Sequence, residues 1–307
     1  MPLALFKTVE SQGRDGSRVQ GVDINEIKKH VAGYWLSPSG VANDANPLVL
    51  AANGQVDLHF TVDPQGHFDW AYIVGVSTGR YSLKFFDGGR NRFLQNMPVL
   101  NELIVGTSFR PLMLPKSYFL DVGNSSREII CTVKDLSGST NTIWLALYGR
   151  RFYHKEMPWG LARDVSRKFF DEGPDYSYFL VPKETSLQGV LDDVASGAEF
   201  SLTFEADDDA NIEIQKIIGS QDWGTSIDNV TIRERDTLRG LNSAPAGAGI
   251  IAASSINATP AYPVYWPDSY LLQRKKQLLV TGRNAGLSTL KPYLMMAGRR
   301  FPHRTEG

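Results

Sequence analysis

A serine motif offers the most direct route to chemistry in this sequence. Gly75-Val-Ser77-Thr-Gly79 matches G-x-S-x-G, the elbow that presents a nucleophilic serine between a strand and a helix. An apolar strand precedes the motif, but the residues from Arg80 to Phe86 alternate like another strand rather than a helix. Glycines at both ends of a turn explain the pattern without catalysis. We therefore expect Ser77 to lie in a hairpin turn and to take no part in hydrolysis.

A glycine-rich motif suggests a dinucleotide site. Gly247-Ala-Gly249-Ile-Ile-Ala252 matches G-x-G-x-x-A, which needs a buried strand before it and a helix that opens at it. The preceding residues 239–245, RGLNSAP, are typical of a loop. The motif therefore indicates a glycine-rich loop that leads into a strand.

Metal-binding patterns are also weak. Asp207, Asp208 and Asp209 could begin a calcium loop, but no spaced acidic ligands follow them. The histidines show no paired metal spacing; they are His30, His59, His67, His154 and His303. We expect no catalytic residue, no metal, no cofactor and no enzymatic activity.

Bulk properties limit the partners. The chain has 307 residues, which suggests two domains. Its net charge of −1 provides no field that would attract nucleic acid or an anionic membrane. Cys131 is the only cysteine, so an intrachain disulfide framework is excluded. The sequence has neither the apolar core of a signal peptide nor a stretch of about 18 apolar residues. We expect synthesis in a cytoplasm, no membrane association and no sequence-specific binding of nucleic acid.

The elements that must position any site come from a duplication. Several residues recur at shifts of 144 to 152 residues. Leu58, Phe60, Asp63 and Gly75 recur as Leu202, Phe204, Asp207 and Gly219. Pro111-x-x-x-Pro115-x-Ser-Tyr118 recurs as Pro263-x-x-x-Pro267-x-Ser-Tyr270, and Gly149-Arg-Arg-Phe152 recurs as Gly298-Arg-Arg-Phe301. Solenoid units are only about 20–50 residues long, so this period indicates two whole domains.

Each copy has a β pattern. Val56, Leu58, Phe60 and Val62 alternate with polar residues, and turn signals separate further short strands. These strands are FDWAYIVG, RYSLKFF, LNELIVG, REIICTV and NTIWLALYG. The expected fold is mainly β, with two tandem duplicated β-sandwich, jelly-roll-like domains and short flanking helices. The double-proline stretch is expected at a sheet edge or at a corner between sheets.

Two segments have helical spacing. Asp23 and Glu26 form a variant of the capping box, and Ile24, Ile27, Val31 and Tyr34 then share one helical face. Leu161, Val165 and Phe169 repeat the pattern between the copies, and Ser186–Ser196 fits either a short helix or a strand. The predicted division is an N-terminal arm with a short helix (1–50), a first sandwich (51–155), a connector with a short helix (156–196) and a second sandwich (197–307).

Candidate interface residues follow from this division. Adjacent arginines on a strand point to opposite faces, and arginines form bidentate pairs with carboxylates, here expected on a neighbouring subunit. Close aromatic residues and the apolar side of the arm add further candidates. The predicted interface consists of Arg150, Arg151, Arg299, Arg300, Tyr265, Trp266, Tyr270, Ile27, Val31 and Trp35. We expect a homo-oligomer, and we expect deletion of residues 1–36 to leave both sandwiches folded while it lowers the oligomeric mass.

The order of turn signals in the first copy resembles a β-domain of structural proteins from tailed bacteriophage particles. The matching segments are residues 73–75 (IVG), 87–96 (DGGRNRFLQN), 105–107 (VGT), Pro111 with Leu114-Pro115, and 136–141 (LSGSTN). The second copy shows no clear equivalent of the last segment. This resemblance implies a non-enzymatic virion protein in the capsid, its decoration or the head–tail junction, with itself and other virion proteins as partners. The alternatives are a lectin-like carbohydrate-binding module and, third, an esterase acting through Ser77.

Overall fold

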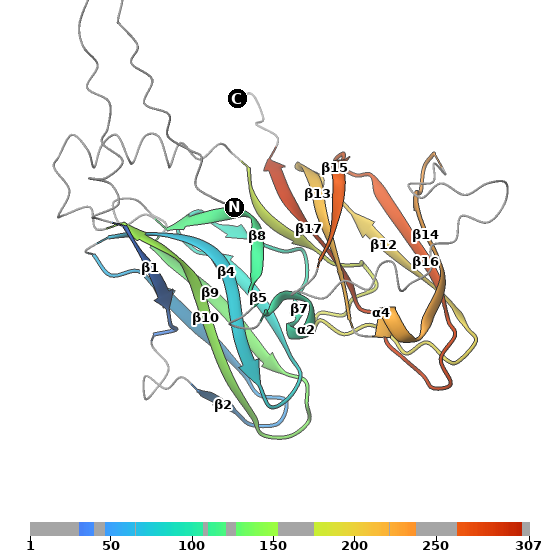
Figure 1. The fold of residues 1–307 in the computed structure, drawn as a ribbon, viewed down its shortest axis with the longest axis horizontal. Coiled ribbons are helices and arrows are strands. Elements are labelled where there is room, and N and C mark those ends of the chain that lie inside the picture. Colours follow the sequence, from blue (N-terminus) through green and yellow to red (C-terminus); the bar gives the residue numbers. More distant parts are fainter. Residues whose placement is uncertain are drawn as a thin grey trace, which may run out of the picture.

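The computed structural model describes residues 31–39, 47–64, 66–106, 110–120, 127–152, 175–220, 222–237 and 263–302. These residues are mainly antiparallel β-structure, arranged as two sandwiches that lie side by side (Figure 1). The strands fit their sequence because apolar residues alternate or run continuously along them, as strands in contact with a core require.

The first sandwich has two facing sheets. One sheet has the order β1-β10-β4-β8, formed by Val31–Leu36, Asn141–Phe152, His67–Ser77 and Leu112–Leu120, and β2 (Leu48–Leu50) also pairs with β10. The other has the order β3-β9-β5-β6, formed by Gln55–Thr61, Glu128–Asp135, Tyr81–Asp87 and Arg92–Phe93, and β7 (Val99–Leu100) also pairs with β5. The short helix α2 (Asn101–Ile104) follows β7.

The second sandwich repeats this order. One sheet is β11-β17-β13-β15, formed by Tyr176–Leu180, Leu294–Pro302, Ala210–Gly219 and Val264–Leu272. The facing sheet is β12-β16-β14, formed by Glu199–Glu205, Gln277–Asn284 and Ile227–Glu234, with the short helix α4 (Asp222–Thr225) before β14. The tandem duplicated sandwiches predicted from the sequence are therefore confirmed.

Both copies contain the same β-bulge. The register of β4 shifts between Trp70 and Tyr72, and that of β13 shifts between Ile214 and Lys216. Opposite the bulges lie Gly149 and Gly298, where an added Cβ would be 2.0 Å from the carbonyl oxygens of residues 69 and 213 respectively. Only glycine fits at such a distance, which explains why the Gly-Arg-Arg-Phe segment begins with glycine twice.

The double-proline segments form the edge strands β8 and β15. Both edge strands are irregular in the same way. Two residues that are two positions apart on the neighbouring strand, β4 or β13, pair with edge-strand residues that have four residues between them. Pro115 and Pro267 lie within these irregular segments. Because proline cannot donate a ladder hydrogen bond, it belongs at an edge or a bulge. The edge position predicted for this motif is correct in both copies.

The prediction of a helix through Val31 and Tyr34 is wrong at these residues, which belong to strand β1. Tyr34 contacts Phe68 at a centroid distance of 5.9 Å, whereas Trp35 lies on the opposite face of the strand beside Tyr148. Apolar residues on both faces of a strand produced the apparent helical spacing. An arm deletion that ends at residue 36 would remove β1 from the first sheet. The first strand pairing therefore begins inside the predicted arm, and Ile27 lies outside the described residues.

Three further predictions fall on the connections. The predicted strand LNELIVG is instead the end of β7 and helix α2, where Leu103 and Ile104 are buried by a single helical turn. Residues 186–196 form turns with one isolated bridge, Val194 to Leu290, rather than a helix or a named strand. Strand β11 lies within the predicted connector, and the helix predicted at Leu161–Phe169 lies outside the described residues.

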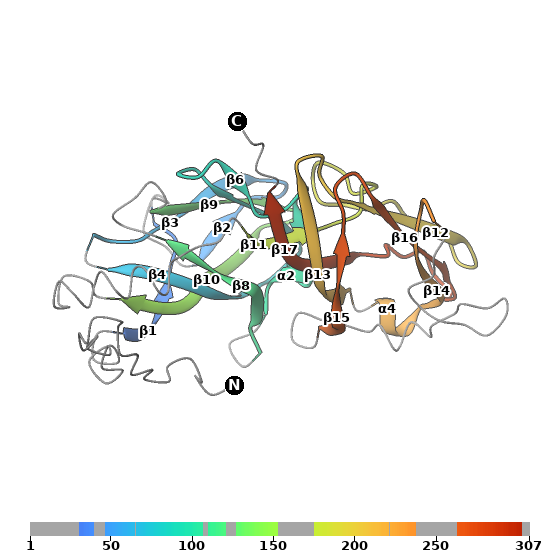
Figure 2. The ribbon, with the colours of Figure 1, turned by 90° about the horizontal axis from the view of Figure 1, so that it is seen from above.

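The two sandwiches contact each other closely. The second is turned so that the sheet β11-β17-β13-β15 faces the first (Figure 2). Phe179 N donates to Leu94 O at 2.8 Å, and the Asn96 side chain makes two hydrogen bonds to the backbone of Val181. Buried side chains of both halves form one continuous cluster. The duplicated units therefore share part of their core.

Candidate functional site

The arginines of the first copy pair within the chain. Arg150 Nε donates to Asp69 Oδ2 at 3.1 Å on one face of β10. Arg151 is buried on the opposite face, where it pairs with Asp63 and its guanidinium lies 4.7 Å from the centre of the Tyr34 ring. The opposite directions predicted for the two side chains are correct. Their partners are carboxylates of the same half.

The second copy repeats this arrangement. Arg299 Nε donates to Glu213 Oε2 at 2.7 Å, and Arg300 Nε donates to Asp207 Oδ2 at 3.0 Å. Burial would raise the pKa of Glu213, but hydrogen bonds from Ser269 and Arg299 more than offset it and hold that pKa below its usual value. Carboxylates of the same chain therefore bind all four arginines. The pairing with carboxylates of a neighbouring subunit stays a prediction.

Ser77 lies at the end of β4, in the connection to β5 in the opposite sheet. The prediction of a hairpin turn is thus wrong, although the strand predicted after the serine is correct. Ser77 Oγ donates to Gly79 O at 2.8 Å, and Gly79 N donates to Asn141 Oδ1 at 3.0 Å. The residues after Ser77 therefore lack the helix of a nucleophile elbow, and its hydroxyl closes a turn.

The loop after β9 has a counterpart that the sequence did not show. Asp135 accepts hydrogen bonds from Ser137 N and Gly138 N, and Asn284 Oδ1 accepts one from Gly286 N after β16. The equivalent of residues 136–141 is therefore 285–290. Asp135 and Asn284 are different residue types that accept the same kind of turn hydrogen bond, so a comparison of residue identities did not reveal this equivalence.

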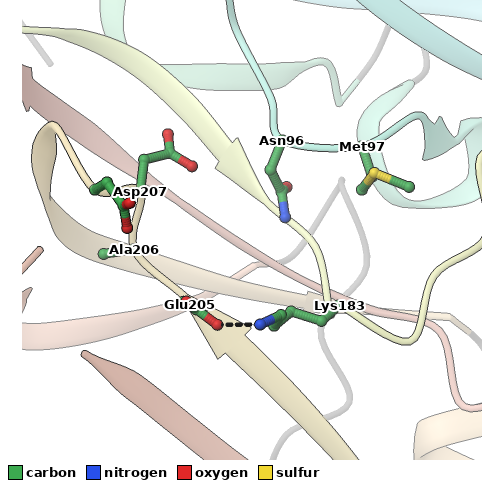
Figure 3. Close-up of a pocket in the computed structure, with 7 residues that line it drawn as sticks. Asn96, Met97, Lys183, Glu205, Ala206 and Asp207 are labelled. Carbon is green, nitrogen blue, oxygen red and sulfur yellow. Dashed lines mark hydrogen bonds and ion pairs between the residues drawn. The ribbon is translucent and has the colours of Figure 1, made fainter. Parts of the chain in front are cut away.

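A cavity of about 410 Å³ opens where the two halves meet (Figure 3). Its polar side chains already bind protein groups: Lys183 pairs with Glu205, and Asp207 accepts hydrogen bonds from Tyr178 and Arg300. The Asn96 amide is used by Val181, as described above. Of these groups only Asn96 links the two halves, and the others pair within the second. Few donors or acceptors are left for a ligand.

The predicted aromatic cluster does not form one surface. Trp266 and Tyr270 stack at 5.7 Å and pack against the core, whereas Tyr265 is exposed. A cavity of about 490 Å³ lies beside Tyr270, but the Tyr270 hydroxyl donates to Glu234 Oε1 at 2.6 Å. A sugar platform would need exposed aromatic rings side by side. Of the predicted cluster, only Tyr265 offers an exposed ring.

A buried lysine links the two halves. Lys216 Nζ donates to Met113 O at 2.6 Å, and it lies 5.3 Å from the centre of the Tyr265 ring. Burial lowers the pKa of the Lys216 amine to about 8. No local pattern in the sequence marks this residue, because its burial depends on how the second sandwich meets the first.

The register defines one equivalent row of residues across the outer face of each large sheet. In the first copy the row runs through Trp35, Tyr148, Tyr72 and Met113. In the second copy it runs through Phe179, Ala297, Lys216 and Tyr265. The two rows share strand order and register, so their environments can be compared position by position.

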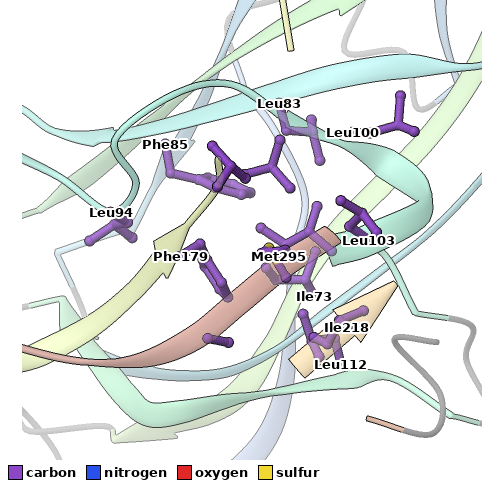
Figure 4. Close-up of a cluster of buried hydrophobic side chains, with 14 of the residues drawn as sticks. Ile73, Leu83, Phe85, Leu94, Leu100, Leu103, Leu112, Phe179, Ile218 and Met295 are labelled. Carbon is purple, nitrogen blue, oxygen red and sulfur yellow. The ribbon is translucent and has the colours of Figure 1, made fainter. Parts of the chain in front are cut away.

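The outer face of the second sandwich is buried against the first. Phe179, Ile218 and Met295 lie among Leu94, Leu103 and Leu112 (Figure 4). We call this set the buried outer face: Ser177, Phe179, Lys216, Ile218, Met295 and Ala297. It covers one edge of the first sandwich.

The described residues leave most of the corresponding face of the first sandwich open. Trp35 is 50% exposed and Val76 is 62% exposed. Of the ten large apolar side chains exposed in the described residues, five belong to this face. We call it the exposed outer face: Trp35, Val49, Tyr72, Val76, Met113, Trp144 and Tyr148. None of these seven side chains is charged, and the charged pair Arg150–Asp69 lies beside them on the same face.

The sequence identified only Trp35 of this face. Val31 lies at the same edge of the sheet and is partly buried. The missed signal is the strand TIWLALY, in which apolar residues are consecutive rather than alternating. Such a strand is typical of a sheet that is covered on both faces. Here the described residues cover the inner face fully and leave most of the outer face open, with Val74 buried at 5% exposure on the outer side.

Among the described residues, no group of three or more histidine, cysteine, aspartate or glutamate side chains could hold a metal ion. None of their helices is long and apolar enough to cross a bilayer.

No family model and no curated protein matches the chain. Among solved structures, a chain from the Sulfolobus turreted icosahedral virus is similar at 7% identity and a TM-score of 0.26, over 90% of this chain. An archaeal virus protein described by its triple jelly roll fold and turret assembly is similar at 9% identity and a TM-score of 0.23, over 88%. The chain spans 61% and 60% of the length of these two viral chains. The ANX1 ectodomain of Arabidopsis thaliana is similar at 7% identity and a TM-score of 0.23, over 94% of this chain and 93% of that one. Similarities at TM-scores this low do not assign a function.

Proposed function

We propose that this chain is a non-enzymatic structural protein of a phage particle, which assembles into a symmetric oligomer in the capsid or head–tail region. The observation that carries the proposal is the exposed outer face of the first sandwich. Monomeric proteins rarely leave a continuous apolar surface of this kind uncovered. A protein that works by assembly keeps such a surface for its neighbours.

The composition of this face fits a protein partner. It has two tryptophans and two tyrosines, residue types that are enriched at interfaces because they bury a large area at a low cost in side-chain entropy. Burying a large apolar side chain contributes about 1.5–3 kcal/mol relative to full exposure. Several half-exposed side chains on one sheet can therefore contribute substantially to association.

The placement in a phage particle rests on the resemblance of the turn segments. Residues 87–96 and 136–141 span strand ends and connections of the first sandwich, and residues 73–75 lie in the last part of β4. Two sandwiches with little net charge suit a building block that packs closely with its copies. The proposed partners are the chain itself and other virion proteins, and the proposed location is the virion after synthesis in the host cytoplasm.

The proposal is tested by the mass of the full chain as a function of concentration. We expect native mass spectrometry and light scattering to show a discrete oligomer, and the substitution Val76→Asp to shift it toward monomer. Electron microscopy of the oligomer should show a ring or a shell fragment. A chain that stays monomeric at high concentration and binds glycans on an array would contradict the proposal and support the carbohydrate-binding alternative.

A further inference from the structure

We propose that the exposed outer face of the first sandwich binds the β15 edge of the second sandwich in another copy of this chain, so that copies join head to tail. The inference rests on the proposed function, because it names the partner and the contact through which the oligomer forms. Its basis is that the molecule already contains one such contact between its own halves.

The internal contact pairs a face with an edge. The buried outer face of the second sandwich lies on the edge of the first that is formed by β8 and residues 94–96. Side chains of the second sandwich form hydrogen bonds with backbone groups of this edge. Lys216 Nζ donates to Met113 O, and Lys116 N donates to Ser177 Oγ at 2.8 Å. Apolar side chains fill the space between them (Figure 4).

One surface of each kind is left over in every chain. In the internal contact, the first sandwich contributes its β8 edge, so its outer face stays without a partner within the described residues. The second sandwich contributes its outer face, so the open side of its edge strand β15 stays without a partner there. Tyr265 occupies in β15 the position that Met113 occupies in β8, and it is 56% exposed. Leu271 is a second exposed apolar residue on the same strand.

The residues of the exposed outer face suit a contact of the same kind. Trp35 occupies the position that Phe179 occupies in the internal contact, and both side chains are aromatic. Tyr72 stands where Lys216 stands, and its hydroxyl can donate to a backbone carbonyl as the lysine amine does. The seven residues of the face carry no charge, and the neighbouring Arg150 and Asp69 pair with each other, so we expect a mainly apolar contact that is only weakly sensitive to salt.

The geometry has a consequence for assembly. A contact between two different surfaces is heterologous, so it continues from copy to copy and gives a closed ring or an open filament. A face-to-face contact would instead give a dimer that stops. The two arrangements are separated by changing the face and the edge in different molecules.

The experiment uses three full-length variants. The face variant is Trp35→Asp, with Val76→Asp as a second version in case the first does not fold. The edge variant carries Tyr265→Asp and Leu271→Asp. The control is Leu287→Asp, since Leu287 is 102% exposed in the loop between β16 and β17 and belongs to neither surface. Circular dichroism and thermal melting establish that each variant is folded.

We expect wild type and control to form the same oligomer in native mass spectrometry. The face and edge variants should each require at least tenfold higher concentration to assemble. An equimolar mixture of the two should form dimers and nothing larger, because each molecule retains one complementary surface.

Other results overturn the inference. An edge variant that assembles like wild type, while the face variant does not, would show a face-to-face dimer and leave the proposed function intact. A wild-type chain that is monomeric until residues 1–30 are deleted would show that this segment of the same chain covers the face. Wild type that is monomeric with or without these residues would remove self-assembly and the proposed function together.

Discussion

The outer faces of the two sandwiches have the same strands, the same register and opposite surroundings. Trp35 and Phe179 occupy equivalent positions beside residues 148 and 297, yet Trp35 is half exposed and Phe179 is completely buried. Duplication therefore copied the fold but not the environment of each position. A surface that is core in one copy is available for interaction in the other.

The residue types at the equivalent positions explain the difference. The buried face has Ala297 where the exposed face has Tyr148, and the small side chain allows a neighbouring edge to approach closely. Close packing with a fixed partner favours side chains that fill a defined space. A face rich in large aromatic rings instead resembles the central part of a protein interface.

The largest test of this comparison is truncation at the equivalent positions. Phe179→Ala should lower the free energy of unfolding by about 3–5 kcal/mol, because it leaves a cavity in the shared core. Trp35→Ala should lower that of the monomer by only about 1 kcal/mol, since half of its side chain already contacts water. Urea unfolding measures both values. Equal losses would show that the two faces have the same environment.

The bulge tests what the copies share. Gly149→Ala and Gly298→Ala should each lower the free energy of unfolding by about 3 kcal/mol, because each new Cβ would overlap a carbonyl oxygen of the neighbouring strand. Gly88→Ala is the control, since its Cβ would meet nothing closer than a Phe86 ring carbon at 3.7 Å. A large loss in one copy alone would mean that the bulge is required in only one sandwich.

Lys216 should make stability depend on pH between about 8 and about 10. Its pKa in the folded chain is about 8, below the value of about 10.4 in an unfolded chain. The unfolded chain therefore binds more protons in this range, and the free energy of unfolding should rise with pH by up to about 1.4 kcal/mol per unit. Lys216→Met should remove this rise.

The control for the pH effect is Lys275→Met, because Lys275 is an exposed lysine in the turn before β16. In Lys275→Met, the free energy of unfolding, measured with urea at each pH, should rise with pH as it does in the wild type. If the free energy of unfolding of Lys216→Met still rises with pH, the pH dependence comes from a group other than Lys216.

The smallest expected effect concerns the arginine pairs. Asp207→Asn should lower the free energy of unfolding by about 1–2 kcal/mol, because Arg300 is mostly buried and loses one of its carboxylates. Asp208→Asn should change it by less than about 0.5 kcal/mol, since Asp208 is 81% exposed at its side chain. Thermal melting compares the two. A similar shift for both would indicate that the pairing at Asp207 is solvated and contributes little.

Much of the fold could be predicted because strands carry a local signal. The alternation around Leu58 and the run NTIWLALYG identified β3 and β10, and the repeated prolines identified the edges. Strand β1 was missed because apolar residues on both of its faces imitate helical spacing. Helix α2 was missed because a single turn buries Leu103 and Ile104 in the same way as a strand would.

The candidate site was predicted less well. The opposite directions of Arg150 and Arg151 follow from the strand period, but their partners Asp69 and Asp63 come from distant positions that only the folded sheet brings close. The exposed outer face was reduced to Trp35, because a sequence cannot show which of two apolar faces meets the core. Lys216 carried no signal at all.

The sequence by itself determined the duplication, most of the strands and the glycine that recurs before each arginine pair, because repeats, alternation and turn chemistry are local properties of the chain. Only the tertiary structure decided which carboxylates bind the arginines, that Lys216 is buried, and that one outer face is covered while its duplicate is open. These features depend on how the second sandwich rests on the edge of the first, and that docking is set by side chains far apart in sequence whose packing no local pattern encodes.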